Sequence, residues 1–193
     1  MVALTGDLAD GVVEVLGKEA EPLTSLVAPY GKFFVTGNHE YYYNAEKWIA
    51  KVAEMGFIAL INSNEIIHYK GKNILMAGIT DYRAEHFIKH HRSDPMKAIQ
   101  RNETSELKIL LAHQPKSIFA SAKAGFDIQL SGHTHGGQFI PWQLAIGIDQ
   151  PYLAGLYTHD DMLLYVSRGT GYWGPPVRMG APSEITILKL VRE

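Results

Sequence analysis

The sequence predicts a single α/β domain over residues 1–193, a sandwich in which two packed mixed β-sheets are flanked by helices. Two observations support this fold class. Strand-like and helix-like patterns alternate through most of the chain, whereas the last strand-like runs follow one another with no helix between them. The hydrophobic content of 46% over 193 residues is sufficient for one core.

The first part of the chain reads as strand, helix and strand. Residues 2–5 are a short apolar run, and residues 11–28 carry apolar side chains at helical spacing. Residues 32–36 are a β-branched and aromatic run that ends at Gly37. An alternation of strand, helix and strand predicts a helix that packs against a sheet.

A helix and a hairpin are expected next. Residues 44–55 read as a helix that begins with a capping asparagine and stops before Gly56. Residues 65–69 and 73–80 are strand-like, and Gly71 between them suits the bend of a hairpin.

Residues 81–101 form a polar stretch that holds three histidines and an Asp-Pro pair. They predict a surface excursion with a short helix after the proline. Strand-like and helix-like patterns resume after this polar stretch. Strands are expected at residues 108–112, 127–131, 163–167 and 184–190, and a helix is expected at residues 116–123.

Composition excludes several classes of protein. The formal charge of −2 argues against a nucleic-acid polymer as partner. The absence of cysteine excludes disulfide scaffolds, cysteine-ligated zinc and thiol catalysis. No apolar run approaches the roughly 20 residues that cross a bilayer, so membrane contact is expected only through a segment outside this sequence. Cellular location and oligomeric state stay open.

Four segments place polar residues directly after predicted strands, at residues 6–10, 37–40, 112–115 and 132–137. Taken singly, Asp7 reads equally well as a helix N-cap, Asn38 as a turn residue and His113 as a hydrogen-bonded structural histidine. Together they offer a carboxylate, an amide oxygen and imidazoles beside glycines that let backbones approach closely. This combination predicts a metal site.

The donor types narrow the choice of ion. Oxygen and nitrogen donors without cysteine suit manganese, iron, cobalt or zinc better than calcium. His133 and His135 are two residues apart, and in an extended loop both side chains would face the same pocket and serve adjacent ions.

The order of these segments resembles that of the calcineurin-like metallophosphoesterases. Their signature is Asp-X-His, Gly-Asp-X-X-Asp, Gly-Asn-His-Asp/Glu, a lone His and Gly-His-X-His. The last four occur here at residues 6–10, 37–40, 113 and 132–135. Longer stretches, such as VTGNHEYY, LSGHTHGGQ and YVSRGTGYWGPPVR, resemble the membrane-associated branch, which includes transmembrane proteins with a metallophosphoesterase domain and exported or anchored bacterial relatives.

One part of the signature is missing, because no aspartate in this sequence has a histidine two places later. We therefore expect a domain that is shortened at its N-terminus and lacks the first strand of the sandwich, which carries the Asp-X-His motif in the family.

The resemblance implies a role for each matching residue. Asp7 would bridge two divalent transition-metal ions, Mn, Fe, Zn or Co, which together activate water for attack on a phosphoester. The remaining ligands would be Asn38, His113 and His133 at one ion and His135 at the other. The second ion is expected to bind weakly, because the missing motif would have supplied one carboxylate and one imidazole.

His39 would lie outside the metal ligands and protonate the leaving oxygen or stabilise phosphoryl charge, although a structural hydrogen bond is the alternative. Asp10 would lie behind the ligands and orient His39 or the loop. The other histidines are expected to be surface or packing residues; they are His68, His86, His90, His91 and His159.

Four residues are candidates for substrate contacts. Arg168 and Arg178 lie in a Gly-Pro-rich region and could clamp phosphate, although such arginines are more often solvated or paired locally. Tyr41 and Trp173 lie near the predicted site, where rings usually serve packing. Rings beside a phosphate site also favour a lipid-linked or nucleotide phosphodiester with an apolar or planar leaving group.

The leading hypothesis is a metal-dependent hydrolase of phosphoesters that uses a dinuclear metal centre and metal-activated water, with phosphodiesters as the expected substrates. The alternatives are a non-catalytic scaffold of the same fold and a weakly active fragment with one metal site. A structural zinc site is disfavoured, because such sites usually use cysteines in closed tetrahedral shells.

Overall fold

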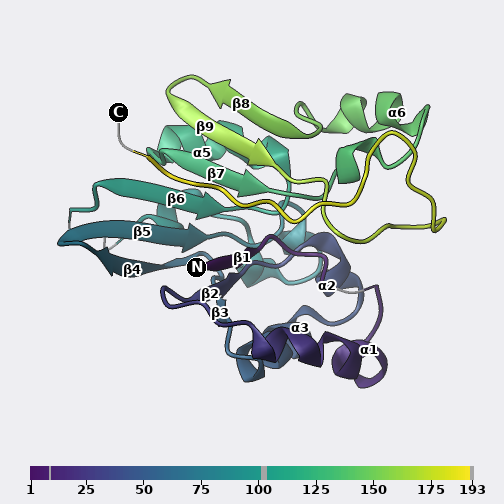
Figure 1. Ribbon diagram of the computed structural model, residues 1–193, viewed down its shortest axis with the longest axis horizontal. Helices are drawn as coiled ribbons and strands as arrows, with labels where there is room; N and C mark the ends of the chain where they lie inside the picture. The colour runs from purple at the N-terminus through teal and green to yellow at the C-terminus, as the bar shows by residue number, and fades with distance from the viewer. Residues whose placement is uncertain (9, 101–103, 192–193) are drawn as a thin grey trace.

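The computed structural model describes residues 1–8, 10–100 and 104–191. Two β-sheets lie face to face with helices on their outer sides (Figure 1). The predicted α/β sandwich is therefore confirmed. Within the described residues, no helix is long and apolar enough to cross a membrane.

The smaller sheet has three strands in the order β1-β2-β3, which are Val2–Leu4, Lys32–Phe34 and Ile58–Ala59. Both strand pairs are parallel. β1 is an edge strand within the described part of the chain.

The larger sheet is mixed and has the order β4-β5-β6-β7-β9-β8. Its strands are β4 Ser63–Tyr69, β5 Lys72–Gly78, β6 Leu107–Leu111, β7 Ile128–Ser131, β8 Gly155–His159 and β9 Met162–Val166. The β4–β5 and β8–β9 pairs are antiparallel hairpins, and the pairs between β5, β6, β7 and β9 are parallel. The carboxyl ends of these four parallel strands consequently meet at one edge of the sheet.

The helices are short. They are α1 Val13–Ala20, α2 Asn38–Tyr42, α3 Ala45–Glu54, α4 Pro95–Ala98, α5 Ile118–Ala124 and α6 Trp142–Asp149. Single 3₁₀ turns occur at Glu21–Ser25, Ala84–His86, Lys89–His91, Pro115–Ser117 and His135–Gly137. α1 and α3 cover the outer face of the smaller sheet (Figure 1).

Alternation along the strands fills three layers of core. Phe33 of β2 and Met76 of β5 pack between the two sheets. Phe34 points to the other side and packs with Val52 of α3, while Leu75 packs with α4 and α5. Packing on both faces of β2 and β5 holds these central strands in place, and with them the strand ends from which the loops leave.

The predicted strand at residues 184–190 is wrong. This segment pairs with no strand among the described residues, and its side chains Ile185 and Ile187 are 87% and 93% exposed. β9 is already paired on both edges, so it leaves no partner for a later strand. The segment instead crosses the front of the sandwich without regular structure (Figure 1, yellow).

Other differences are smaller. The first helix is α1 alone, because a 3₁₀ turn begins at Glu21 with a proline in its first turn. The polar stretch from residue 81 is less exposed than expected, since His91 and Ala98 are buried; the last residue of the predicted range, 101, lies outside the described residues. Its short helix after Pro95 is confirmed as α4.

Candidate metal centre

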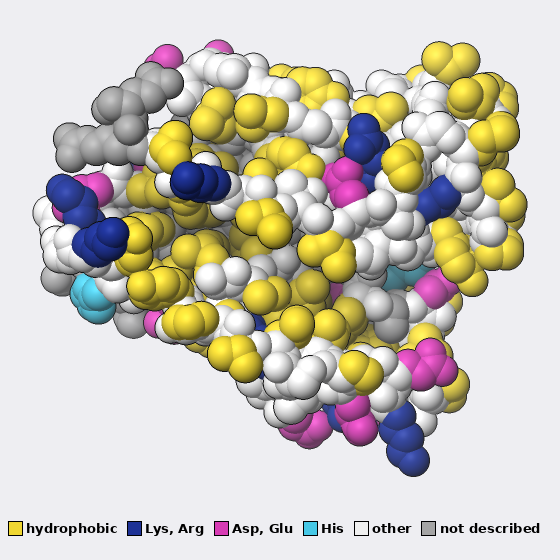
Figure 2. Space-filling model, viewed as in Figure 1, with side chains coloured by type: hydrophobic (Ala, Val, Ile, Leu, Met, Phe, Trp, Pro, Cys, Tyr) yellow, Lys and Arg dark blue, Asp and Glu magenta, His cyan; other side chains and the backbone are white. Residues whose placement is uncertain are grey.

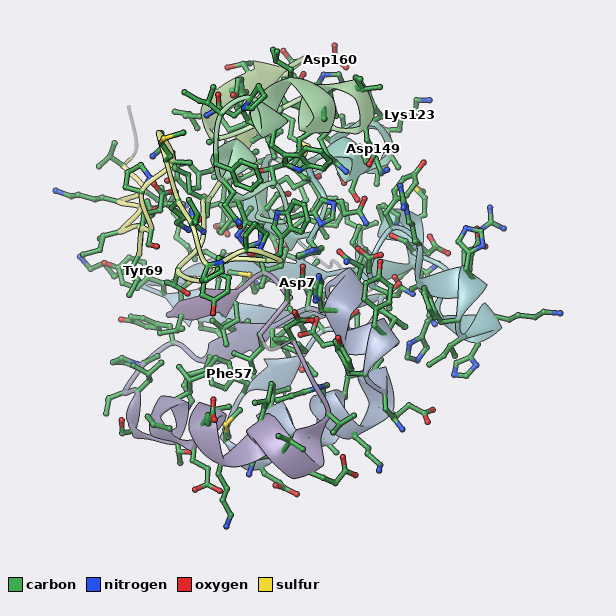
Figure 3. The ribbon with its side chains drawn as sticks, turned by 90° about the vertical axis from the view of Figure 1, so that its right-hand side faces the viewer. Asp7, Phe57, Tyr69, Lys123, Asp149 and Asp160 are labelled. Atoms are coloured by element: carbon green, nitrogen blue, oxygen red, sulfur yellow. The ribbon has the colours of Figure 1, made fainter. Side chains whose placement is uncertain are left out.

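Four loops from both sheets meet at one end of the sandwich. Asp7 follows β1, Asn38 begins α2, His113 follows β6 and His133 follows β7. In Figure 3, which looks at this end, Asp7 lies between the two sheet layers. The sequence motifs that were expected to converge therefore do so, except that Ala9 within the first motif lies outside the described residues.

His113 is the centre of this cluster. Its Nε2 atom lies 3.0 Å from Oδ2 of Asp7, 3.0 Å from Nδ1 of His133 and 3.2 Å from Oδ1 of Asn38. Ligand atoms of Asp7, His113 and His133 all lie within 4.8 Å of one another. Four donor atoms from four separate loops thus surround one small volume.

The other nitrogen of His113 fixes the orientation of the ring. Nδ1 lies 2.6 Å from the carbonyl oxygen of Thr5, which can only accept, so Nδ1 carries the proton. Nε2 then faces the cluster and offers it a lone pair when the ring is neutral. A backbone carbonyl behind a ligating histidine is the usual arrangement in metal sites.

The cluster fits a cation on chemical grounds. A neutral His113 presents a lone pair to the acceptor oxygens of Asp7 and Asn38, and a protonated one has a single N–H to share between them. A divalent ion satisfies all four donors at once. Two imidazoles, a carboxylate and an amide oxygen suit a transition metal of intermediate hardness.

The pKa values of the cluster follow from burial and from pairing. Burial opposes ionisation of Asp7, but the charge of His113 and its hydrogen bond hold the pKa of Asp7 below its ordinary value. Burial also disfavours a charged His113, yet Asp7 outweighs it and raises the pKa of His113 to about 9. Burial and the charge of His113 lower the pKa of His133 to about 3. His133 is therefore neutral at pH 7 without an ion, whereas His113 carries a proton on Nε2 that an arriving ion would displace.

Two glycines allow the first two loops to touch. Gly6 has a φ of +89°, and a Cβ atom there would lie 2.4 Å from the backbone nitrogen of Gly37. A Cβ atom on Gly37 would lie 2.1 Å from Oδ1 of Asp7. Any side chain at either position would push Asp7 away from Asn38.

Glu40 holds the same two loops together, and the sequence analysis assigned it no role. Its buried carboxylate accepts hydrogen bonds from the backbone N–H groups of Asp7 at 2.9 Å, Leu8 at 2.8 Å and Gly37 at 2.6 Å. Burial, followed by the charge of Asp7, raises the pKa of Glu40 to about 7. A glutamate in the first turn of a helix is a capping signal that could have identified it.

His39 lies beside the cluster rather than in it. Its backbone N–H donates to Oδ1 of Asp7 at 2.9 Å, and its ring Nδ1 lies 2.9 Å from Oδ1 of Asp10. With Nδ1 engaged, Nε2 remains as the ring atom that can reach a bound molecule. Asp10 thus contacts His39 and stands apart from the ligand atoms.

The loop at residues 132–137 is not extended, which corrects the reasoning about His133 and His135. Both residues have positive φ values, 69° and 52°, and a 3₁₀ turn begins at His135. Both still line the same cavity. Nδ1 of His135 lies 3.1 Å from the Arg178 guanidinium, and burial followed by this positive charge lowers the pKa of His135 to about 4.

A cavity of about 680 Å³ opens from the cluster between the two sheets. Its lining includes His39, Arg168, Tyr172 and Trp173, together with apolar side chains of both sheets. One oxygen of Glu184 accepts from Arg168 Nη1 at 2.8 Å, so part of this guanidinium is already paired.

Two of the expected substrate contacts, Tyr41 and Arg178, lie outside the cavity lining. Tyr41 is buried away from the cavity, where its hydroxyl lies 2.9 Å from Nδ1 of His91. Arg178 does not line the cavity either, because its guanidinium donates to backbone carbonyls; these belong to His135, Arg168, Gly171 and Ala181. Arg178 therefore stabilises the loop, while Tyr41 is part of the core.

The remaining histidines lie outside the cluster. His91 packs against Tyr41, His68 bonds to Asn73 and His159 bonds to Tyr152. None of the five lines the cavity. Their expected surface or packing roles agree with these positions.

A family model described as calcineurin-like phosphoesterase matches residues 1–137. The chain belongs to the calcineurin-like phosphoesterase family. Among other members, an uncharacterized metallophosphoesterase of Helicobacter pylori is 40% identical over 193 residues, which cover 99% of this chain and 51% of the relative. A bovine transmembrane protein with metallophosphoesterase domain is 38% identical over 203 residues, with 98% and 45% covered.

The chain thus spans about half the length of these curated members of the calcineurin-like phosphoesterase family. Solved structures with the same fold include Thermus thermophilus sulfate thiohydrolase SoxB, at a TM-score of 0.58 and 13% identity over 86% of this chain and 33% of that one. Haemophilus influenzae NAD nucleotidase has a TM-score of 0.54 and 14% identity, with 88% and 40% covered. At these identities the likeness concerns the fold alone.

Proposed function

We propose that this chain is a metal-dependent phosphoester hydrolase that acts on phosphodiesters. The observation that carries the proposal is the convergence of Asp7, Asn38, His113 and His133 beside a cavity that is also lined by His39. A structural ion site has no need of a cavity or of an imidazole beside it.

The residues present can hold a divalent transition metal at the His113 cluster, and a second, weaker ion between Asp7 and His135. When bound, such ions polarise phosphoryl oxygens and activate water. Asn38 provides an oxygen without adding negative charge, which keeps the cluster attractive to an anionic substrate.

His39 is the proposed catalytic acid. Asp10 holds its Nδ1 at 2.9 Å and thereby directs Nε2 toward the cavity. A ring oriented in this way can give a proton to the leaving oxygen or hydrogen-bond to the phosphoryl group. Arg168 can add a charge contact, and Trp173 can contact a planar or apolar leaving group, such as that of a lipid-linked or nucleotide phosphodiester.

One observation favours the second candidate, a binding scaffold with a single ion. His135 has its Nδ1 engaged by Arg178 and provides only one further nitrogen to a neighbouring ion. If that ion is never held, water activation between two metals is lost, although a phosphate group can still bind to the first.

Hydrolysis of bis(4-nitrophenyl) phosphate by the purified chain separates these candidates. We expect nitrophenol release that requires added Mn²⁺, stops with a chelator and disappears in His133→Ala. A chain that retains a bound ion and shows no release at any metal concentration would be the scaffold instead.

A further inference from the structure

The surface around α6 is unusually apolar for the outside of a protein. None of the α6 residues is buried, and Leu144 and Ile148, one helical turn apart, are 79% and 89% exposed. The loop after β9 extends this surface. We call the whole set the apolar rim; its exposed members are Ile140, Trp142, Leu144, Ile148, Tyr172, Val177 and Met179. Figure 2 shows hydrophobic side chains gathered at this end of the molecule.

The two segments of the apolar rim are joined to each other. The Trp142 and Trp173 rings lie 5.8 Å apart, and the Gln138 side chain bonds to the backbone of Trp173 in both directions. The backbone N–H of Met179 also donates to Gln138. α6 and the loop therefore form one continuous surface.

Charge is sparse on this surface and lies at its border. Asp149, the last residue of α6, is exposed and pairs with Lys116 and Arg83. Residues 139–148 contain no charged side chain and residues 169–183 contain only Arg178, although 20% of the whole chain is charged. Arg178 is occupied by its own loop carbonyls. An interface with another protein normally has polar and charged contacts around its apolar centre. The apolar rim offers few polar or charged groups for such contacts.

We propose that the apolar rim docks this domain on a lipid surface. Leu144 and Ile148 protrude, and fluid acyl chains can close around protruding side chains where a rigid partner would need matching pockets. Trp142 and Tyr172 are the residue types that prefer the water–lipid boundary. Tyr172 belongs both to the apolar rim and to the cavity lining, so docking brings the cavity mouth to the membrane.

This proposal assigns membrane contact to the chain itself, whereas the sequence suggested contact only through another segment. It stands apart from the proposed hydrolase activity, because lipid docking needs neither metal nor turnover. Binding should depend on apolar contact, since the apolar rim has no free cation for anionic lipid.

Co-sedimentation of the full chain with phosphatidylcholine vesicles tests the proposal. We expect the chain to pellet with vesicles, with no increase when phosphatidylglycerol is added and no loss at high salt. Leu144→Glu and Ile148→Glu should each reduce the partition coefficient at least tenfold. Val15→Glu is the matched control, because Val15 is also exposed, at 69%, but lies on α1 away from the apolar rim. Circular dichroism checks that each variant is folded.

Three outcomes would overturn the docking. The wild-type chain fails to pellet with any vesicle; Val15→Glu loses as much binding as Leu144→Glu; or the chain forms a dimer that Leu144→Glu dissolves and that does not bind vesicles. In the last case the apolar rim joins two copies. Nitrophenol release is scored separately, so a chain that binds vesicles without hydrolysis refutes only the proposed activity.

Discussion

The two sides of the candidate metal centre differ in how many donor atoms the chain offers. The His113 side gathers four donors from four loops within hydrogen-bonding distance. The His135 side has one imidazole, next to a guanidinium, and shares Asp7, whose Oδ1 already accepts the N–H of His39. Among the described residues, only the first side forms a group of three or more potential His, Asp or Glu ligands.

This difference predicts that the two sites are unequal even though they share a motif. Gly-His-X-His is expected to supply one ligand to each side, but affinity depends on the whole donor set and on nearby charge. A positive Arg178 beside His135 repels a cation, whereas a negative Asp7 beside His113 attracts one.

Loss of a ligand on the first side should remove its ion. We expect His133→Ala to lower metal affinity by more than about 100-fold and to abolish activity, because direct ligands contribute more than their supporting partners do. Elemental analysis of the dialysed protein measures this. His68→Ala, a histidine on β4 far from the cluster, should retain full metal content. A His133→Ala protein with full metal content would remove His133 from the ligand set.

Calorimetric titration with Mn²⁺ measures the inequality itself. We expect one ion to bind tightly and a second to bind orders of magnitude more weakly, because two protein ligands leave most of the coordination shell to solvent. Activity, where present, should rise with the second ion. Two equally tight ions per chain would contradict the comparison and would require further ligands on the His135 side.

Replacement of His39 should reduce turnover without reducing the affinity for the tight ion. His39→Ala should keep the tight ion and reduce turnover by about 100-fold or more, as expected for loss of a general acid. Metal content and kcat are measured on the same preparation. Loss of the ion in this variant would mean that His39 acts on the cluster and not on the substrate.

Replacement of Glu40 should affect both sides of the candidate metal centre, because Glu40 positions Asp7, which the two sides share. Glu40→Gln turns one acceptor into an amide donor opposite backbone N–H groups, which should lower the free energy of unfolding by about 1–3 kcal/mol. Thermal unfolding measures this. The exposed Glu19→Gln on α1 is the control and should change stability little. Equal stability of the two variants would show that the three hydrogen bonds of Glu40 are dispensable.

The smallest effect concerns the leaving group. Activity should be higher on an aryl phosphodiester than on a small alkyl monoester. Trp173→Ala should reduce that preference by about two- to tenfold, because ring contacts contribute about 0.5–1.5 kcal/mol. Tyr41→Phe should leave the preference unchanged, since Tyr41 lies outside the cavity. Specificity constants for both substrates provide the comparison, and an unchanged ratio in Trp173→Ala would remove this ring from the substrate contacts.

The sequence predicted the fold class and the converging loops because strand ends, glycines and polar residues recur in a fixed order. Periodicity could not place residues 184–190, whose alternating pattern suits a strand but whose pairing depends on edges that distant residues occupy. Nor could it separate Tyr41 from Trp173, since both rings were expected near the site. Only the packing of Tyr41 against His91 shows which ring belongs to the core.

The hydrogen bonds of Glu40 also determine at which stage the backbone of the metal centre loses its conformational entropy. Fixing the backbone of one residue costs roughly 1–2 kcal/mol in conformational entropy. Since Glu40 restrains the N–H groups of Asp7, Leu8 and Gly37 through contacts within the chain, this entropy is lost during folding. An arriving ion then meets ligands that are already ordered, so more of its coordination energy remains as affinity.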